Sequence, residues 1–201
     1  MLPSQFADLS AYPSISRFVQ LHFDMQFDDI RGMMKLPRPR QGITGGCNFA
    51  AALGLCNLVA GAAVVLYEKP RGYPGTGNGF VALLMQFYPW SHGETPQSRA
   101  EILYNLVRNP LAHSIGTGRT PGQRRSQIRI EKRALREREL RRLELATVRP
   151  AHLPTVVTFV GSEYRLSVIS LYWGVIQLFR GLFRDTHQMT ATQRRLQQEG
   201  W

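Results

Sequence analysis

One uncharged and largely apolar segment, Cys47–Tyr67, limits what the chain can fold into more than any other feature. Its 21 residues include no Asp, Glu, Lys or Arg, and about twenty apolar residues suffice for a helix that crosses a bilayer. The segment also holds Asn48 and many Ala and Gly residues, which let helices pack closely. A fully buried core helix explains it equally well. Since no second convincing span is present, we expect a buried helix over about 46–68 and keep a transmembrane helix as the alternative.

Apolar residues upstream predict another buried helix. They recur at spacings of three and four, which places them on one helical face: Ile15, Val19, Phe23, Phe27, Ile30 and Met34. Pro13 can occupy the first turn of this helix, and Pro37 and Pro39 can end it. Shorter helices are predicted over 80–88 and 96–107.

The C-terminal half is predicted to combine strands with helices. Residues 127–131 alternate polar and apolar side chains as a strand does. Two short runs, 156–160 and 164–169, flank Gly161-Ser162 and predict a β-hairpin. Between the strand at 127–131 and this hairpin, residues 133–147 predict a helix dense in charge.

From the charged helix onward, the sequence predicts a local ion pair, one long helix and a tail. In the charged helix, Glu137 and Arg141 have the spacing of an i,i+4 ion pair. The last long helix is marked by large apolar residues at helical spacing: Tyr172, Ile176, Phe179 and Phe183. The polar tail from Met189 is expected to fray.

These elements predict a mostly α fold: a helical bundle with a small β-hairpin insertion before the last helix. We expect one domain in three parts. Residues 1–118 form the helical bundle and carry an Arg-Asn-x3-His motif. Residues 119–163 form a basic insertion with short strands and the charged helix. Residues 164–201 supply a strand, the final bundle helix and the polar tail.

The net charge of +11 is concentrated in one region. Residues 119–149 hold eleven basic and four acidic side chains, and a positive region of this kind suits a polyanion such as RNA. We assign the predicted RNA contacts to Arg124, Arg125 and Arg129. The alternative is codon bias in a GC-rich genome, because the basic residues are nearly all Arg.

Cys47 and Cys56 are the only cysteines, and both lie in the uncharged segment. Without further Cys or nearby His residues, the sequence supports neither a disulfide framework nor a zinc site. We expect two reduced thiols in a cytoplasmic protein and no metal or other cofactor. The N-terminal residues lack a basic region followed by an apolar run, so no signal peptide is expected.

Arg108 and His113 form an Arg-x4-His pattern, a spacing that is weak evidence alone. The full string over residues 104–116, YNLVRNPLAHSIG, resembles the signature of the HEPN family: an Arg, a polar residue, three further residues and a His. Asn109 fills the polar position, and the motif ends a predicted bundle helix as it does in the family. The resemblance covers roughly residues 14–116 and, more loosely, the last predicted helix.

The resemblance implies a HEPN-like helical bundle and a metal-independent ribonuclease. Such an enzyme uses the 2′-hydroxyl of the RNA as nucleophile, so it needs a group that transfers protons and a cation beside the phosphate. His113 is suited to general acid or base catalysis. Arg108 can hold the phosphate bidentately and stabilise the charge that develops on it, and Asn109 can orient either group. Pro110 lacks a backbone donor and is expected to kink the helix here.

The leading hypothesis is therefore a cytoplasmic endoribonuclease of the toxin–antitoxin or defence type. The resemblance implies a homodimer in which both motifs line one cleft, with RNA and an antitoxin protein as partners and no membrane. The alternative is a non-catalytic HEPN-like module that dimerises or binds RNA. For the motif itself, the alternative is an ion pair between Arg108 and Glu101, with His113 inside the bundle.

Overall fold

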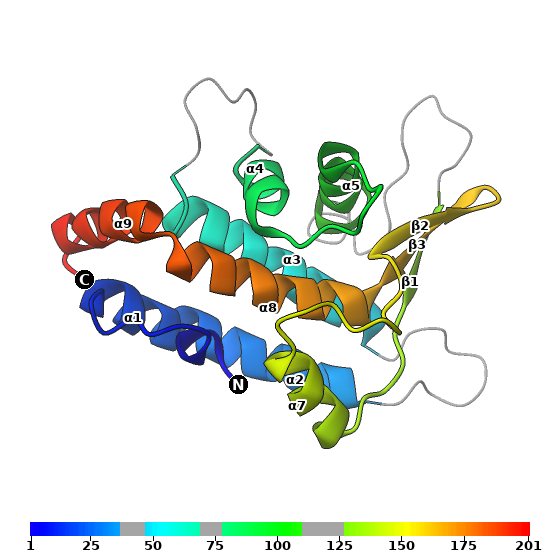
Figure 1. Cartoon of the computed structure of the whole chain (residues 1–201), viewed down its shortest axis with the longest axis horizontal. Helices are drawn as coiled ribbons and strands as arrows, with labels where there is room; N and C mark the ends of the chain where they lie inside the picture. Colours follow the sequence, from blue (N-terminus) through cyan, green and yellow to red (C-terminus); the bar gives the residue numbers. More distant parts are fainter. Residues whose placement is uncertain (37–46, 69–77, 110–126) are drawn as a thin grey trace.

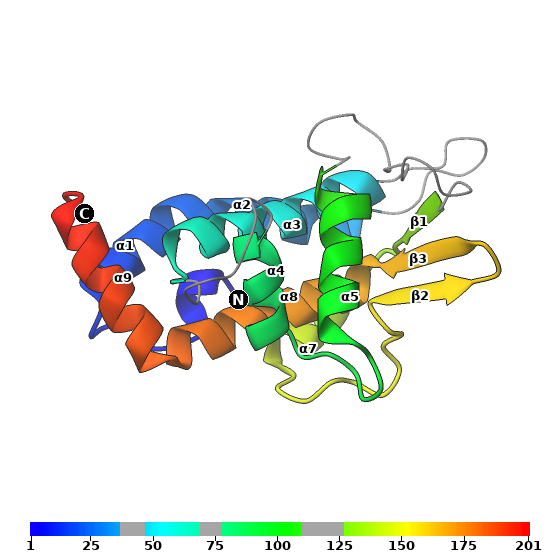
Figure 2. The same ribbon diagram turned by 90° about the horizontal axis from the view of Figure 1, so that it is seen from above.

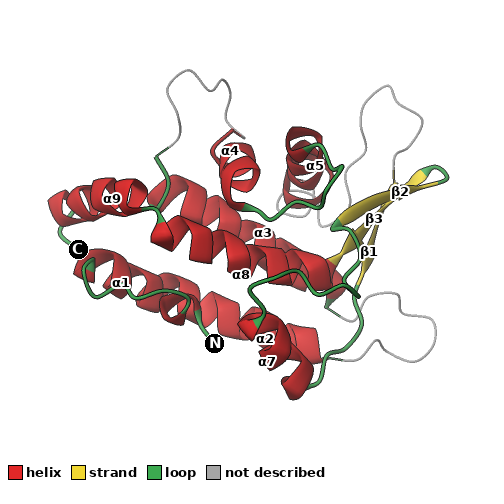
Figure 3. Cartoon of the chain, in the orientation of Figure 1, coloured by secondary structure: helices red, strands yellow, loops and turns green. Residues whose placement is uncertain are grey.

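The computed structural model describes residues 1–36, 47–68, 78–109 and 127–201 (Figure 1). The helices of these residues are a short 3₁₀-helix η1 (Pro3–Gln5), α1 (Pro13–Val19), the π-helix η2 (Gln20–Asp24), α2 (Met25–Lys35), α3 (Asn48–Val65), α4 (Asn78–Phe87), α5 (Pro96–Ile102), the π-helix η3 (Leu103–Arg108), α7 (Glu137–Leu145), α8 (Val168–Arg184) and α9 (Thr186–Gln198). The strands are β1 (Gln127–Glu131), β2 (Val157–Val160) and β3 (Glu163–Ser167). The fold is mostly α with a small sheet, as predicted (Figure 3).

Helices α3 and α8 form the centre of the bundle and run from the sheet toward α9 (Figure 1). Helices α1 and α2 pack on one side of this pair, and α4 and α5 lie on another (Figures 1 and 2). The sheet projects from the end of the bundle opposite α9. The basic region predicted from the sequence is therefore divided, in its described part, between strand β1 of the sheet and helix α7, which lies against α2 and α8.

The predicted N-terminal apolar face is confirmed. All six of its residues are buried, from Ile15 to Met34. Pro13 begins α1, and the chain continues through η2 into α2 without a break. The aromatic residues of this face meet α8, where the rings of Phe27 and Tyr172 stack 5.2 Å apart. Such stacked pairs add to the energy of apolar burial.

Helix α3 lies in the core. We expected it to be fully buried, but part of its surface is exposed. Leu55 and Leu58 are inaccessible, whereas Phe49 is 41% exposed and Val64 is 75% exposed. Within the described part of the chain, Asn48–Val65 is the one helix whose length and composition would let it cross a membrane, and 44% of that window is buried. Core helices of soluble proteins meet the same criterion, and α3 packs against α2, α8 and η3.

The predicted hairpin and strand join into one three-stranded sheet. β2 and β3 are antiparallel around Gly161, whose φ of 64° suits the tight turn. β1 pairs with β3 in parallel, which the sequence did not indicate. One face of the sheet is buried through Ile128, Ile130 and Leu166. The opposite face carries polar side chains, because successive residues of a strand alternate between faces.

Helix α7 is shorter than predicted and forms a different ion pair. It begins at Glu137 rather than residue 133, and Glu139 accepts a hydrogen bond from the backbone N–H of Arg136 at its first turn. Glu137 contacts Arg31 and Lys35 of α2 instead of the predicted Arg141. The ion pair therefore joins two helices rather than two turns of one helix.

A buried carboxylate anchors α7 to the bundle. Glu144 accepts hydrogen bonds from Arg31 Nε and Tyr172 Oη, both at 2.8 Å, and the amine of Met1 lies 2.9 Å away. Burial raises the pKa of the Tyr172 hydroxyl, and the neighbouring Glu144 raises it further. Arg180 of α8 donates to the backbone carbonyl of Glu144. These contacts bind α7 to both α2 and α8.

The prediction that the polar tail frays is wrong, because residues 186–198 form a further helix, α9, after α8. Asp185 caps α9 by accepting from the N–H of Gln188. Thr192 donates to the carbonyl of Leu66 at the end of α3, and Gln193 accepts from the N–H of Ser14. The tail is polar and still ordered, because hydrogen bonds dock it onto α1 and α3.

Replacing Gly174 by Ala is expected to destabilise the protein by about 3 kcal/mol, the upper end for overpacking a core. An added Cβ would overlap the buried ring of Tyr88, whose hydroxyl donates to the carbonyl of Ser170. Urea unfolding would measure the change. The matched control is Gly32→Ala on α2, where a Cβ meets no atom within 4 Å. This control should gain up to about 1 kcal/mol from helix propensity. Equal effects of the two variants would contradict the predicted overlap.

Candidate functional site

Arg108 is the last residue of η3, which continues directly from α5. Leu103, Leu106 and Val107 are buried and hold this helix against the core, so Arg108 has a fixed backbone. The motif thus begins at the end of a bundle helix, as the sequence indicates. A π-helical turn is rare and is frequently found at functional sites.

The guanidinium of Arg108 has few partners. Its Nη1 lies 3.4 Å from Oδ1 of Asn109, and its Cζ lies 5.9 Å from the ring centre of Tyr104. Its Nε is buried and has no hydrogen-bond partner among the residues that the structure describes. No carboxylate in the described residues forms an ion pair with Arg108; Glu101, the alternative partner, accepts from Gln97 at 2.9 Å. The guanidinium therefore keeps unused donors.

Cys56 of α3 is close enough to Arg108 to sense its charge. Burial raises the pKa of the Cys56 thiol to about 12, and the Arg108 cation acts in the opposite sense. Cys56 is therefore a protonated core residue rather than a nucleophile. Cys47 and Cys56 are both free thiols.

Three of the predicted site residues lie outside the described residues: His113, Arg124 and Arg125. Pro110 lies outside them too. The structure places Arg108 and Asn109 side by side, and the remainder of the motif stays a prediction. Within the described ranges, no three His, Cys, Asp or Glu side chains gather as metal ligands would.

Arg129, the third predicted RNA contact, lies on the polar face of the sheet. Its side chain is exposed, and its Nε is 3.5 Å from Glu131 Oε1. The strand register places it beside Arg165 of β3. The carboxylate of Glu131 lies within 4.0 Å of both Arg side chains and offsets part of their positive charge.

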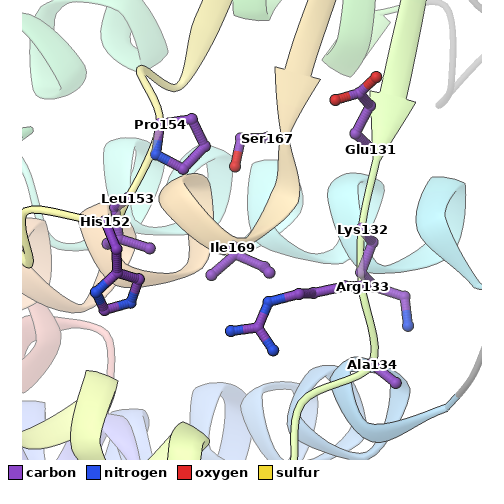
Figure 4. A pocket seen from close by; sticks show the side chains of 9 residues that line it. All are labelled: Glu131, Lys132, Arg133, Ala134, His152, Leu153, Pro154, Ser167 and Ile169. Carbon is purple, nitrogen blue, oxygen red and sulfur yellow. The ribbon is translucent and has the colours of Figure 1, made fainter.

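Sequence reasoning assigned no function to the residues that line three hollows on and beside α7. A hollow of about 550 Å³ lies between the end of β1 and the first turn of α8 (Figure 4). A second, of about 290 Å³, shares Arg133, His152 and Ile169 with it. A third, of about 730 Å³, extends along α7 and shares Arg133 and Arg142 with the second. The high density of Arg residues over 133–142 was the sequence feature that could have indicated these hollows.

No family model matches the chain, and comparison with the curated proteins and with the solved structures finds no match. The resemblance to the HEPN family therefore remains a prediction from the residue pattern around Arg108.

Proposed function

We propose that the chain is a metal-independent endoribonuclease of the toxin or defence type that acts in the cytoplasm. The observation that carries the proposal is Arg108, whose buried Nε has no hydrogen-bond partner and whose guanidinium has no carboxylate partner among the described residues. An unsatisfied buried donor costs roughly 1–3 kcal/mol. A phosphate oxygen bound beside Arg108 would relieve this cost and form a charge-assisted hydrogen bond.

In the proposed reaction, the RNA supplies its own nucleophile. The 2′-oxygen forms a bond to the adjacent phosphorus while the bond from phosphorus to the 5′-oxygen breaks. The products end in a 2′,3′-cyclic phosphate and a 5′-hydroxyl. His113 moves the protons to and from these oxygens. Arg108 stabilises the charge on the non-bridging oxygens, and Asn109 positions Arg108 by accepting from its Nη1. Two protomers would pair so that both motifs face one cleft.

The test is cleavage of single-stranded RNA in excess EDTA, read by gel electrophoresis and mass spectrometry of the ends. We expect cleavage to persist and to leave 2′,3′-cyclic phosphates. An RNA of the same sequence with 2′-O-methyl groups should remain intact, because it lacks the nucleophile. Loss of activity in EDTA, or products with a 5′-phosphate, would contradict the proposal.

The second candidate is a non-catalytic module that binds RNA. It is favoured by the basic hollows along α7, which could hold phosphates without any group that transfers a proton. RNA binding without cleavage in the same assay would select this candidate.

A further inference from the structure

Two hollows along α7, and a third that shares Arg133, His152 and Ile169 with one of them, form one surface that we call the α7 groove. Its basic side chains come from separate parts of the chain and include Lys35, Arg133, Arg136, Arg138, Arg142 and His152. Arg133 lines all three hollows. The groove is therefore a continuous surface and not a set of isolated pits.

The three carboxylates of the groove already contact neighbouring cations, and Glu131 is paired with Arg129 and Arg165. Glu137 contacts Lys35 and Arg31, and these contacts hold its pKa at about 2. Glu139 contacts the N–H of Arg136 and the guanidinium of Arg133, which lower its pKa. Both stay ionised at neutral pH and are committed to these partners.

Three cations of the groove have no such partner. Among the residues that the structure describes, Arg136, Arg138 and Arg142 take part in no ion pair. Arg138 and Arg142 belong to the same helix and line the same hollow. Their charges add to a local positive potential that attracts an anion.

The hollow in Figure 4 adds an apolar floor to this charge. Leu153, Pro154 and Ile169 form the floor, and the side chains of Arg133 and His152 stand at its edge (Figure 4). Its volume of about 550 Å³ is in the range that binds small organic groups. An apolar floor with the guanidinium of Arg133 at its edge suits a nucleotide, whose base is flat and whose phosphate is anionic.

We propose that the α7 groove binds the backbone of a single RNA strand, with one base resting in the hollow of Figure 4 and phosphates beside Arg138 and Arg142. That the polyanion is RNA rests on the proposed function. The groove extends beyond a single hollow, and this favours a strand over a free mononucleotide. It would hold the substrate at a surface different from the Arg108 motif.

The test measures binding without cleavage. A short fluorescent 2′-O-methyl RNA is titrated with the whole chain, and Kd is read by fluorescence anisotropy at several salt concentrations. For Arg138→Gln/Arg142→Gln we expect Kd to rise roughly tenfold at about 0.15 M salt, because affinity comes mainly from counterion release. The slope of log K against log salt should fall by about 1.4, or about 0.7 for each lost phosphate contact.

The matched control is Arg184→Gln/Arg194→Gln, which removes the same charge from exposed positions of α8 and α9. It should leave Kd nearly unchanged. Equal weakening by both double variants would overturn the proposal, since binding would then follow net charge alone. Full displacement of the RNA by equimolar 5′-AMP would also overturn it and assign the hollow to a free nucleotide.

The outcomes separate this proposal from the proposed function. Cleavage by the wild type with unchanged binding in the α7 variant would refute the groove alone. Groove-dependent binding without any cleavage would refute the ribonuclease alone. A wild type that does not bind the oligonucleotide refutes the groove, whatever the cleavage assay gives.

Discussion

Replacing His113 by Ala is expected to slow RNA cleavage by about a hundred- to ten-thousand-fold, the usual range for a general acid or base. Proton transfer occurs at the reacting oxygens, so the loss should appear in the rate of the bound complex. Single-turnover rates at saturating enzyme would measure it. Kd for the 2′-O-methyl RNA should change little, because a neutral imidazole contributes little to phosphate attraction.

His187→Ala is the control for this experiment. His187 is exposed on α9, at the end of the bundle opposite the sheet (Figure 1). Its replacement should leave the cleavage rate unchanged. If His113→Ala cleaves as fast as the wild type, the activity does not depend on the Arg108-x4-His113 motif.

Replacing Glu144 by Gln is expected to lower the free energy of unfolding by about 3–5 kcal/mol, the cost of removing one partner from a buried ion pair. Glu144 is fully buried and accepts from Arg31 and Tyr172. Although burial opposes it, the hydrogen bonds to Glu144 and then Glu137 raise the pKa of Arg31, so its guanidinium stays charged. The variant leaves this charge without its buried partner.

Urea unfolding, followed by circular dichroism, would measure the effect. Glu163→Gln makes the same chemical change at a partly exposed pair with Arg165. Exposed pairs are worth about 0–1 kcal/mol, so this control should unfold nearly as the wild type does. A loss below about 1 kcal/mol for Glu144→Gln would show that the buried carboxylate does not stabilise the fold in the proposed way.

The elements that sequence reasoning located are those with strong local patterns. The apolar spacing from Ile15 to Met34 and the alternation over residues 127–131 each mark a buried face without reference to the rest of the chain. Helix α9 was missed because its docking residues are polar. Gln188 both donates to and accepts from the backbone of Glu68. The spacing of apolar residues gives no indication of such polar side-chain contacts.

The candidate site likewise has one part that the sequence located and one part that it did not. The local string located Arg108 at the end of its helix and Asn109 beside it, since neighbours in sequence stay neighbours in space. The α7 groove could not be located from the sequence. Arg133 and His152 come from two separate connections and Ile169 from the first turn of α8, so the three meet only through tertiary packing. The basic residues were counted correctly, but their shared surface depends on where α7 docks.

The parallel pairing of β1 with β3 also sets the order in which this region can assemble. The hairpin closes through the two residues Gly161-Ser162, whereas β1 and β3 enclose residues 132–162. Closing the longer loop costs roughly 2 kcal/mol more in chain entropy. Such non-local pairs form late in folding unless other contacts shorten the search. The docking of Glu144 supplies such contacts. The α7 groove is thus completed only when the chain is nearly folded, and an isolated peptide with the same basic residues would lack it.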